Sequence, residues 1–104
     1  MGAKFRHRYA NAVVLGGLLR DAKDEGVSAG GGRRARVWLD NPCDENERFD
    51  LHVPVLAIGN RLAAKVLELA GTGALVTVQG EWSTVRSGNE LNHVLVAERI
   101  IEQL

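Results

Sequence analysis

Five stretches of the sequence have the hydrophobic patterning of β-strands. Residues 33–40 and 74–85 alternate apolar with polar positions, so each predicts a strand with one buried face. Residues 11–22, 48–59 and 90–104 are apolar on both faces over part of their length. Such strands need a cover on their second face, and we expect a homo-oligomer to supply part of it.

Glycine and proline mark interruptions of this pattern. The adjacent residues Gly16 and Gly17 predict a bend or bulge in the first strand. Pro54 has no N–H for a sheet ladder, so it predicts an edge position or a gap in the third strand. Residues 23–32 and 41–47 are rich in glycine or in polar turn-forming residues, and we interpret both as loops.

The hydrophobic period changes to that of a helix from Asn60, which is suited to cap the start, and Gly71 is suited to follow the end. The predicted order is therefore three strands, one helix and two strands. This order is typical of an all-β OB-fold, a five-stranded Greek-key barrel with one helix between strands 3 and 4. We expect a basic arm at residues 1–10 and a single OB-fold domain at residues 11–104.

The distribution of charge adds a functional clue that the total hides. The 104 residues carry 13 basic and 13 acidic side chains, so the net charge is zero. Residues 1–36 hold eight basic and three acidic side chains, whereas residues 37–104 hold five and ten. This asymmetry favours a basic surface for a polyanion, and the alternative is a dipolar surface without a partner.

Targeting signals are lacking in the sequence as given. No apolar run approaches the roughly 20 residues of a membrane span, and the first residues hold no apolar signal core. A single cysteine, Cys43, cannot form a disulfide within the chain. We therefore expect a cytoplasmic protein that is not embedded in a membrane.

The outer face of the strand at residues 33–40 carries the strongest candidate chemistry. A period of two places Arg34, Arg36 and Trp38 on one surface. Cations pair with phosphates and an indole stacks on a base, as in proteins that bind single strands with little sequence preference. In the alternative interpretation, Trp38 packs under the helix or at a subunit interface and the arginines are only solvated.

Cations at loops and strand ends extend this surface, and the ring of His52 is a further stacking candidate. The predicted DNA-binding residues are Arg34, Arg36, Trp38, Arg33, Lys23, Arg20, His52 and Arg86. Residues 6–9 of the arm add two arginines and a tyrosine. We expect the acidic residues at 44–47 to bound the binding path, Phe49 to lie in the core, and Trp82 to fill the barrel interior because it is in phase with the apolar residues of its strand.

Catalytic and metal chemistry finds little support. His7, His52 and His93 share no metal-ligand spacing with one another or with Cys43. The glycine-rich segments lack the strand and helix context of phosphate-binding loops. We predict no enzymatic activity, no metal and no cofactor.

Several segments resemble bacterial single-stranded DNA-binding proteins. Residues 11–22, NAVVLGGLLRDA, resemble the opening strand of that family, and residues 53–90 are similar to its third strand, helix, fourth strand and following turn. The segments VTVQGEW (76–82) and HVLVAERI (93–100) also look like primosomal replication protein N (PriB), a dimeric relative. Together the resemblance covers residues 11–104.

The resemblance implies an OB-fold that pairs through its first strand into dimers or tetramers and wraps single-stranded DNA. It places Trp38 in the second-strand region where the family has a base-stacking aromatic, and His52 near a third-strand aromatic. Ser87 lies close to where many members have another tryptophan, so stacking is reduced here. The sequence ends at Leu104, where the barrel should finish, without the acidic tail that members usually carry.

We predict a protein that binds single-stranded DNA with little sequence preference in replication, recombination or repair, as a homodimer or homotetramer. The alternative is a PriB-like primosomal accessory protein that bridges single-stranded DNA and replication or primosome proteins. An OB-fold for structured RNA remains a third possibility.

Overall fold

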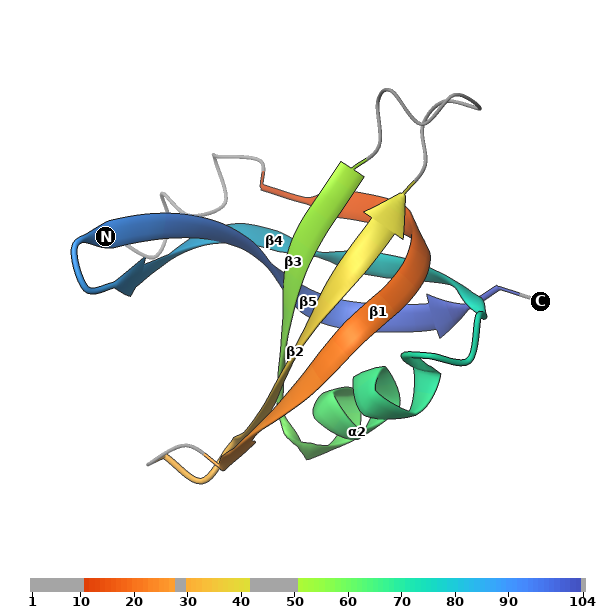
Figure 1. Ribbon diagram of the computed structural model, residues 1–104, viewed down its shortest axis with the longest axis horizontal. Helices are drawn as coiled ribbons and strands as arrows, with labels where there is room; N and C mark the ends of the chain where they lie inside the picture. The colour runs from red at the N-terminus through yellow and green to blue at the C-terminus, as the bar shows by residue number, and fades with distance from the viewer. Residues whose placement is uncertain (1–10, 28–29, 42–50, 104) are drawn as a thin grey trace, which may run out of the picture.

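The structure of the protein, a computed structural model, describes residues 11–27, 30–41 and 51–103. Its elements are β1 (Val13–Val27), β2 (Arg33–Asn41), β3 (Leu51–Ile58), α2 (Asn60–Leu69), β4 (Leu75–Ser87) and β5 (Glu90–Glu102) (Figure 1). The strands close into a barrel in the order β1-β2-β3-β5-β4. The predicted five-stranded OB-fold with its helix between the third and fourth strands is confirmed.

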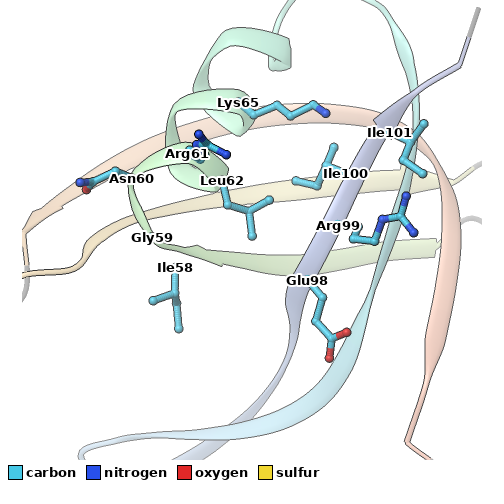
Figure 2. Close-up of a pocket in the computed structure, with 10 residues that line it drawn as sticks. All are labelled: Ile58, Gly59, Asn60, Arg61, Leu62, Lys65, Glu98, Arg99, Ile100 and Ile101. Atoms are coloured by element: carbon cyan, nitrogen blue, oxygen red, sulfur yellow. The ribbon is translucent and has the colours of Figure 1, made fainter.

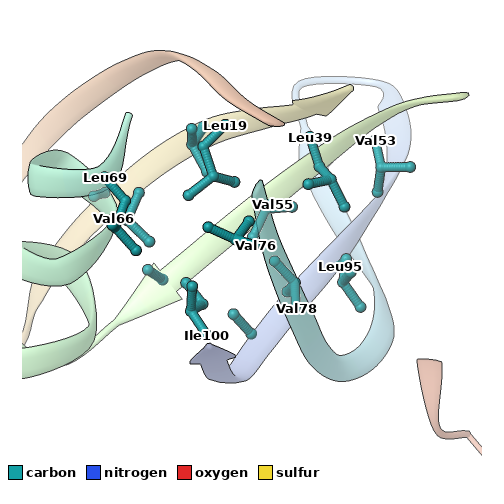
Figure 3. Packing of buried hydrophobic residues seen from close by; sticks show 14 of the residues in the cluster. Leu19, Leu39, Val53, Val55, Val66, Leu69, Val76, Val78, Leu95 and Ile100 are labelled. Carbon is teal, nitrogen blue, oxygen red and sulfur yellow. The ribbon is translucent and has the colours of Figure 1, made fainter. Parts of the chain in front are cut away.

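The hydrophobic core fills the barrel and continues under α2 at one end (Figure 3). On β2 the alternation is as predicted, with Ala35, Val37 and Leu39 buried and the residues between them exposed. The helix presents Ala63 and Val66 to the same cluster, because residues three apart share a helix face. Each fully buried valine or leucine stabilises the fold by about 1.5–3 kcal/mol.

Strand β1 bends and changes its partner. Residues 13–18 pair with β4, and from Leu18 onward the strand pairs with β2. A side chain at Gly17 would place its Cβ 2.2 Å from the backbone oxygen of Asp40, so only glycine allows β1 and β2 to approach this closely. The bend predicted at Gly16 and Gly17 therefore lies where the strand passes from one partner to the other.

The prediction of a loop from residue 23 is wrong, because β1 continues to Val27 and forms a long hairpin with β2. The ladder is irregular between Arg20 and Lys23, where Asp21 adopts a positive φ of 55°. Pairing with β2 supplies hydrogen bonds that outweigh the weak strand propensity of these charged residues.

Strand β3 pairs with β2 along its whole length but with β5 only at two positions, Val55 and Leu56, where the strands run parallel. Pro54 immediately precedes these two residues. Of the two predicted alternatives, an edge position or a gap, the gap is found on the β5 side only: pairing with β5 begins after Pro54, whereas pairing with β2 continues through it.

Strands β4 and β5 form a ribbon that extends well beyond the barrel and ends in a tight turn at Gly88 and Asn89 (Figure 1). The placement of Trp82 in the barrel interior is wrong, because the residue is 41% exposed. Trp82 is on the same face of the ribbon as the buried Leu95, with which it pairs, and this is the face that points into the barrel further along β4. The ladder between β1 and β4, however, already ends at Gly80, so no strand among the described residues covers the indole.

Glycines bound the helix at both ends. Gly59, with a φ of 110°, takes the N-cap position, and no side chain caps the helix there. Asn60 is the first helical residue, so its predicted capping role is wrong. A positive φ at the cap suits glycine rather than asparagine at this chain reversal. The helix ends as predicted, with Gly71 in a left-handed conformation after the C-cap Ala70.

Candidate nucleic-acid interface

The outer face of β2 carries the predicted cluster of cations and indole. Arg34, Arg36 and Trp38 are exposed, whereas the residues between them are buried. Trp38 is 43% exposed and lies in the middle of the sheet, paired with Arg20 on β1 and with Pro54 on β3. The predicted shared face is confirmed, and the indole does not pack under α2.

Trp38 lines three hollows, two of them larger than the third. The first, of about 310 Å³, is lined by Trp38 with Arg20, Asp21, Asp40 and His52. Its members come from β1, β2 and β3, so the sheet itself forms this hollow. It brings together three of the predicted DNA-binding residues, Arg20, Trp38 and His52.

The second hollow, of about 330 Å³, lies between the sheet and the β4–β5 ribbon. Arg36, Trp38 and Pro54 form its floor. Its wall consists of ribbon residues, which are Val85, Asn92, His93 and Val94. Val85 and Asn92 are directly opposite each other in the ladder, so they belong to one face of the ribbon. Trp38 thus has an open space on either side, as a stacking platform requires.

Three of the predicted phosphate ligands are already paired with carboxylates. Arg33 lies 2.5 Å from Asp24, Arg36 lies 3.1 Å from Glu25, and Arg20 lies 2.8 Å from Asp40. The sequence analysis missed these partners. Asp24 and Glu25 belong to a segment that was predicted to be a loop, and their contacts exist only because β1 continues alongside β2.

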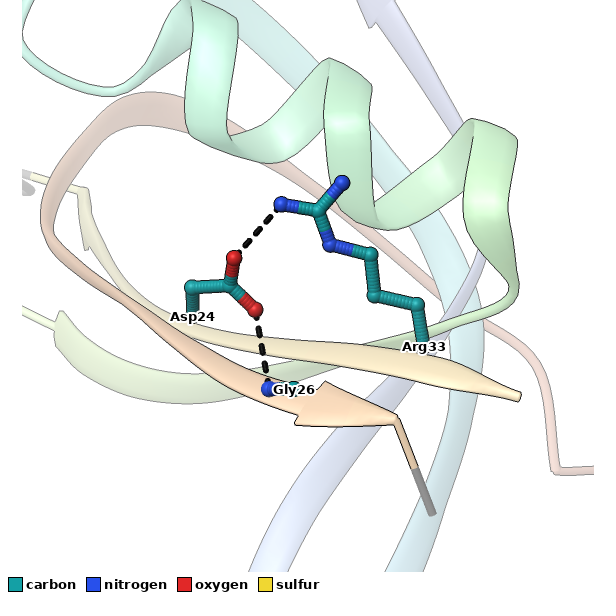
Figure 4. A network of polar contacts seen from close by, with 3 residues as sticks. All are labelled: Asp24, Gly26 and Arg33. Atoms are coloured by element: carbon teal, nitrogen blue, oxygen red, sulfur yellow. Dashed lines mark hydrogen bonds and ion pairs between the residues drawn. The ribbon is translucent and has the colours of Figure 1, made fainter. Parts of the chain in front are cut away.

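The pair of Asp24 and Arg33 closes the end of the β1–β2 hairpin (Figure 4). Asp24 accepts a hydrogen bond from Arg33 through Oδ2 and another from the backbone N–H of Gly26 through Oδ1, at 2.9 Å. The hydrogen bond from Arg33 is the main cause that lowers the pKa of Asp24, and the N–H of Gly26 acts in the same direction. The same hydrogen bond raises the pKa of Arg33, so both groups are charged at neutral pH.

Asp40 lies between two basic side chains in the first hollow. Its Oδ2 pairs with Nε of Arg20, and its Oδ1 lies 2.6 Å from Nδ1 of His52. Oδ1 is buried and accepts no hydrogen bond from the described residues, so the contact with His52 is a close approach rather than an aligned bond.

The other predicted cations, Arg34, Lys23 and Arg86, have no carboxylate partner within the described part of the chain. Lys23 lines a third hollow beside Trp38, together with Arg36 and Val94. Arg86 lies next to the turn of the ribbon, in a pair with Leu91, and is not among the residues that line the hollows at Trp38.

The ribbon wall was also missed by the sequence analysis. Val85, Asn92 and His93 have no signal that distinguishes them from other ribbon residues, because only the curvature of the ribbon over the sheet brings them to Trp38.

Several residues named in the sequence analysis lie outside the described residues. They are residues 6–9 of the arm, Cys43, the acidic residues 44–47, Phe49 and the side chain of Ser87. Among the residues that the structure describes, no three His, Cys, Asp or Glu side chains are grouped to hold a metal ion. The helix found there falls short of the length and apolar character that a membrane span requires.

Searches by sequence found no matching family model and no matching relative among curated proteins. Solved structures do match. Wild-type single-stranded DNA-binding protein from Thermus aquaticus superimposes with a TM-score of 0.70 at 24% identity, over 91% of this chain and 41% of that one. A deletion mutant of the same protein gives 0.71 at 26% identity, over 91% and 42%.

A third match covers almost the whole of its counterpart. The single-stranded DNA-binding (SSB) domain of a protein from Synechococcus sp. superimposes with a TM-score of 0.68 at 13% identity, over 89% of this chain and 96% of that one. This chain spans about two fifths of the length of the Thermus aquaticus protein. The resemblance found in the sequence is confirmed at the level of the fold, which is that of single-stranded DNA-binding proteins.

Proposed function

We propose that this protein binds single-stranded DNA with little sequence preference and acts in replication, recombination or repair. The observation that carries the proposal is the position of Trp38, an exposed indole between two hollows, with arginines on the same strand. The similarity of the fold to single-stranded DNA-binding proteins supports it. A base stacked on Trp38 would leave its phosphates near Arg34, Arg36 and Lys23.

The ion pairs set how strongly charge contributes to this binding. A phosphate that binds Arg36 or Arg33 must either displace the β1 carboxylate that pairs with this arginine or share the arginine with that carboxylate. Exposed ion pairs contribute little to stability, so this competition is compatible with binding but weakens it. The cations without a carboxylate partner among the described residues, Arg34, Lys23 and Arg86, are free to meet phosphates first.

We further propose that the protein forms a homodimer or homotetramer through β1. Residues 13–17 pair with β4 on one side, and no strand within the described residues occupies their other edge. Val14, beside this edge, is 63% exposed, and Leu75 on the outer face of β4 is 53% exposed. An open edge next to exposed apolar side chains favours strand pairing with a second copy. Sedimentation of Val14→Asp should give a smaller particle than the unaltered chain.

The alternative function is that of a PriB-like accessory protein that bridges single-stranded DNA and other proteins. The ion pairs on three arginines favour it, because they lower the positive charge available to DNA. It differs from the main proposal in expecting weak DNA affinity together with a stable protein complex.

The test is fluorescence anisotropy of a labelled thymidine oligomer at several salt concentrations, with a duplex of equal length as the control. We expect the single strand to bind more tightly than the duplex. The slope of log affinity against log salt should be about −2 if three unpaired cations neutralise phosphates, and about −4 if the three paired arginines also do so. A third series of titrations with a structured RNA tests the remaining possibility, that the OB-fold binds structured RNA.

Absence of binding at low salt would exclude the proposal, and equal affinity for duplex and single strand would exclude the stacking role of Trp38. Weak binding with a shallow slope would instead favour the accessory function.

A further inference from the structure

A large groove lies away from Trp38, between the start of α2 and the second half of β5 (Figure 2). Its volume is about 700 Å³, within the range of ligand-binding clefts. The groove exists because β3 pairs with β5 only at Val55 and Leu56, beyond which the two strands diverge. Leu62 of the helix and Ile100 of β5 lie in the space between these elements.

Aliphatic side chains form the apolar part of this groove. Ile58 at the end of β3 is 43% exposed and Ile101 on β5 is 45% exposed, although both are large hydrophobic residues. Leu62 is half-buried beside them. Exposed isoleucines that share a concave surface are typical of a binding site rather than of a solvated face.

Cations rim the same groove. Arg61 and Lys65 lie on α2, Arg99 lies on β5, and all three are exposed. None of them has a carboxylate partner within the part of the chain that the structure describes, in contrast to the arginines around Trp38. Glu98 is the one acidic residue among the lining residues, so the groove carries a net positive charge. In Figure 2, Lys65 extends from the helix toward β5.

We propose that this groove binds an acidic peptide segment of a partner protein, with aliphatic or aromatic side chains of the peptide seated against Ile58 at one end of the groove and Ile101 at the other. Its carboxylates would pair with Arg61, Lys65 and Arg99. The pairing of an apolar floor with a cationic rim is complementary to such a segment in both charge and hydrophobicity. The inference does not rest on DNA binding, because it concerns different residues.

A second path for nucleic acid is the competing occupant, and the composition of the groove disfavours it. None of the described residues that line the groove is aromatic, so they offer no platform for base stacking.

The probe is a short fluorescein-labelled peptide in which pairs of aspartates alternate with leucines, titrated with the full chain and followed by anisotropy. We expect saturable binding. Lys65→Glu and Arg99→Glu should each weaken it at least roughly tenfold, because each removes one attraction and adds one repulsion. Arg34→Glu, on the outer face of β2, is the matched control and should leave peptide affinity within about twofold.

Two further comparisons decide whether the groove binds an acidic peptide or nucleic acid. A peptide with serines in place of leucines should bind at least roughly tenfold more weakly, and so should the original peptide to Ile58→Ser. Equal binding of the serine peptide, or no binding of the leucine peptide at low salt, would overturn the proposal. It would also be overturned if Lys65→Glu weakened binding of the thymidine oligomer as much as Arg34→Glu does, because the groove would then belong to the nucleic-acid path.

Discussion

Replacing Trp38 with alanine tests the proposed interface most directly. Stacking of one base on an aromatic side chain contributes about 1–3 kcal/mol. Trp38→Ala should therefore weaken binding of a thymidine oligomer about 5- to 150-fold. Because the hollows on both sides of the indole depend on it, we expect a value in the upper half of that range if bases occupy both.

The cost of this substitution to stability follows from the exposure of the indole. Trp38 is 43% exposed, so slightly more than half of its surface is covered. A tryptophan buries roughly 150–250 Å² when fully covered, so about 100 Å² is lost here, which corresponds to about 2–3 kcal/mol at 25 cal/mol per Å². A domain of this size with an ordinary stability of about 5–15 kcal/mol remains folded.

Trp82→Ala is the matched control. Trp82 is 41% exposed, so its removal should cost nearly the same free energy of unfolding. Trp82 and Val85 are on opposite faces of the ribbon, so Trp82 is on the face turned away from the second hollow at Trp38. We expect its DNA affinity to stay within about twofold of the unaltered protein.

The assay combines urea denaturation of both variants with anisotropy titrations at one fixed salt concentration. Similar losses of stability together with a loss of affinity only in Trp38→Ala would support the interface. The reasoning is refuted if both variants lose affinity equally, or if Trp38→Ala binds as tightly as the unaltered protein.

Three other predictions concern charge, packing and pH. Glu25→Gln should free Arg36 for phosphate, so we expect affinity for the thymidine oligomer to rise several-fold and the salt dependence to steepen; an unchanged affinity would show that the ion pair does not compete with DNA. Gly80→Ala should lower the free energy of unfolding by roughly 3 kcal/mol, because the added Cβ would lie 2.1 Å from a backbone oxygen of β5. Gly16→Ala is its control, since a Cβ there meets its nearest atoms at 3.6 Å, and equal losses in urea denaturation would contradict this account. The arginine partner of Asp24 lowers the pKa of that carboxyl below its ordinary value of 3.8. The carboxylate therefore stabilises the fold above about pH 5, and this contribution is lost as the pH falls through the lowered pKa. Asp24→Asn should accordingly show a shallower decline in stability between about pH 5 and 3, and identical declines would argue against the pair.

Local patterns were sufficient for the parts of the protein that depend on short-range geometry. A period of two fixes which residues of a strand share a face, so the exposure of Trp38 and the burial of Leu39 could be predicted from residues 33–40 alone. The bend at Gly17 was equally accessible, because glycine in a strand marks a close backbone approach wherever the partner lies.

The same pattern was insufficient for Trp82. The alternation correctly predicted which face of the strand carries Trp82, but burial also requires a neighbouring strand to cover that face. The ladder between β1 and β4 ends at Gly80, and no feature within the ribbon segment reports where another strand stops.

Only the tertiary structure decided which groups meet at the two candidate sites. Glu25 reaches Arg36 across a strand pairing that the composition of residues 23–32 disfavours. The ribbon wall beside Trp38 and the groove between α2 and β5 join segments that are distant in the sequence. Strand and helix periods are set by neighbouring residues, whereas these contacts depend on how the barrel closes, so the sequence determined the faces and the fold determined what each face meets.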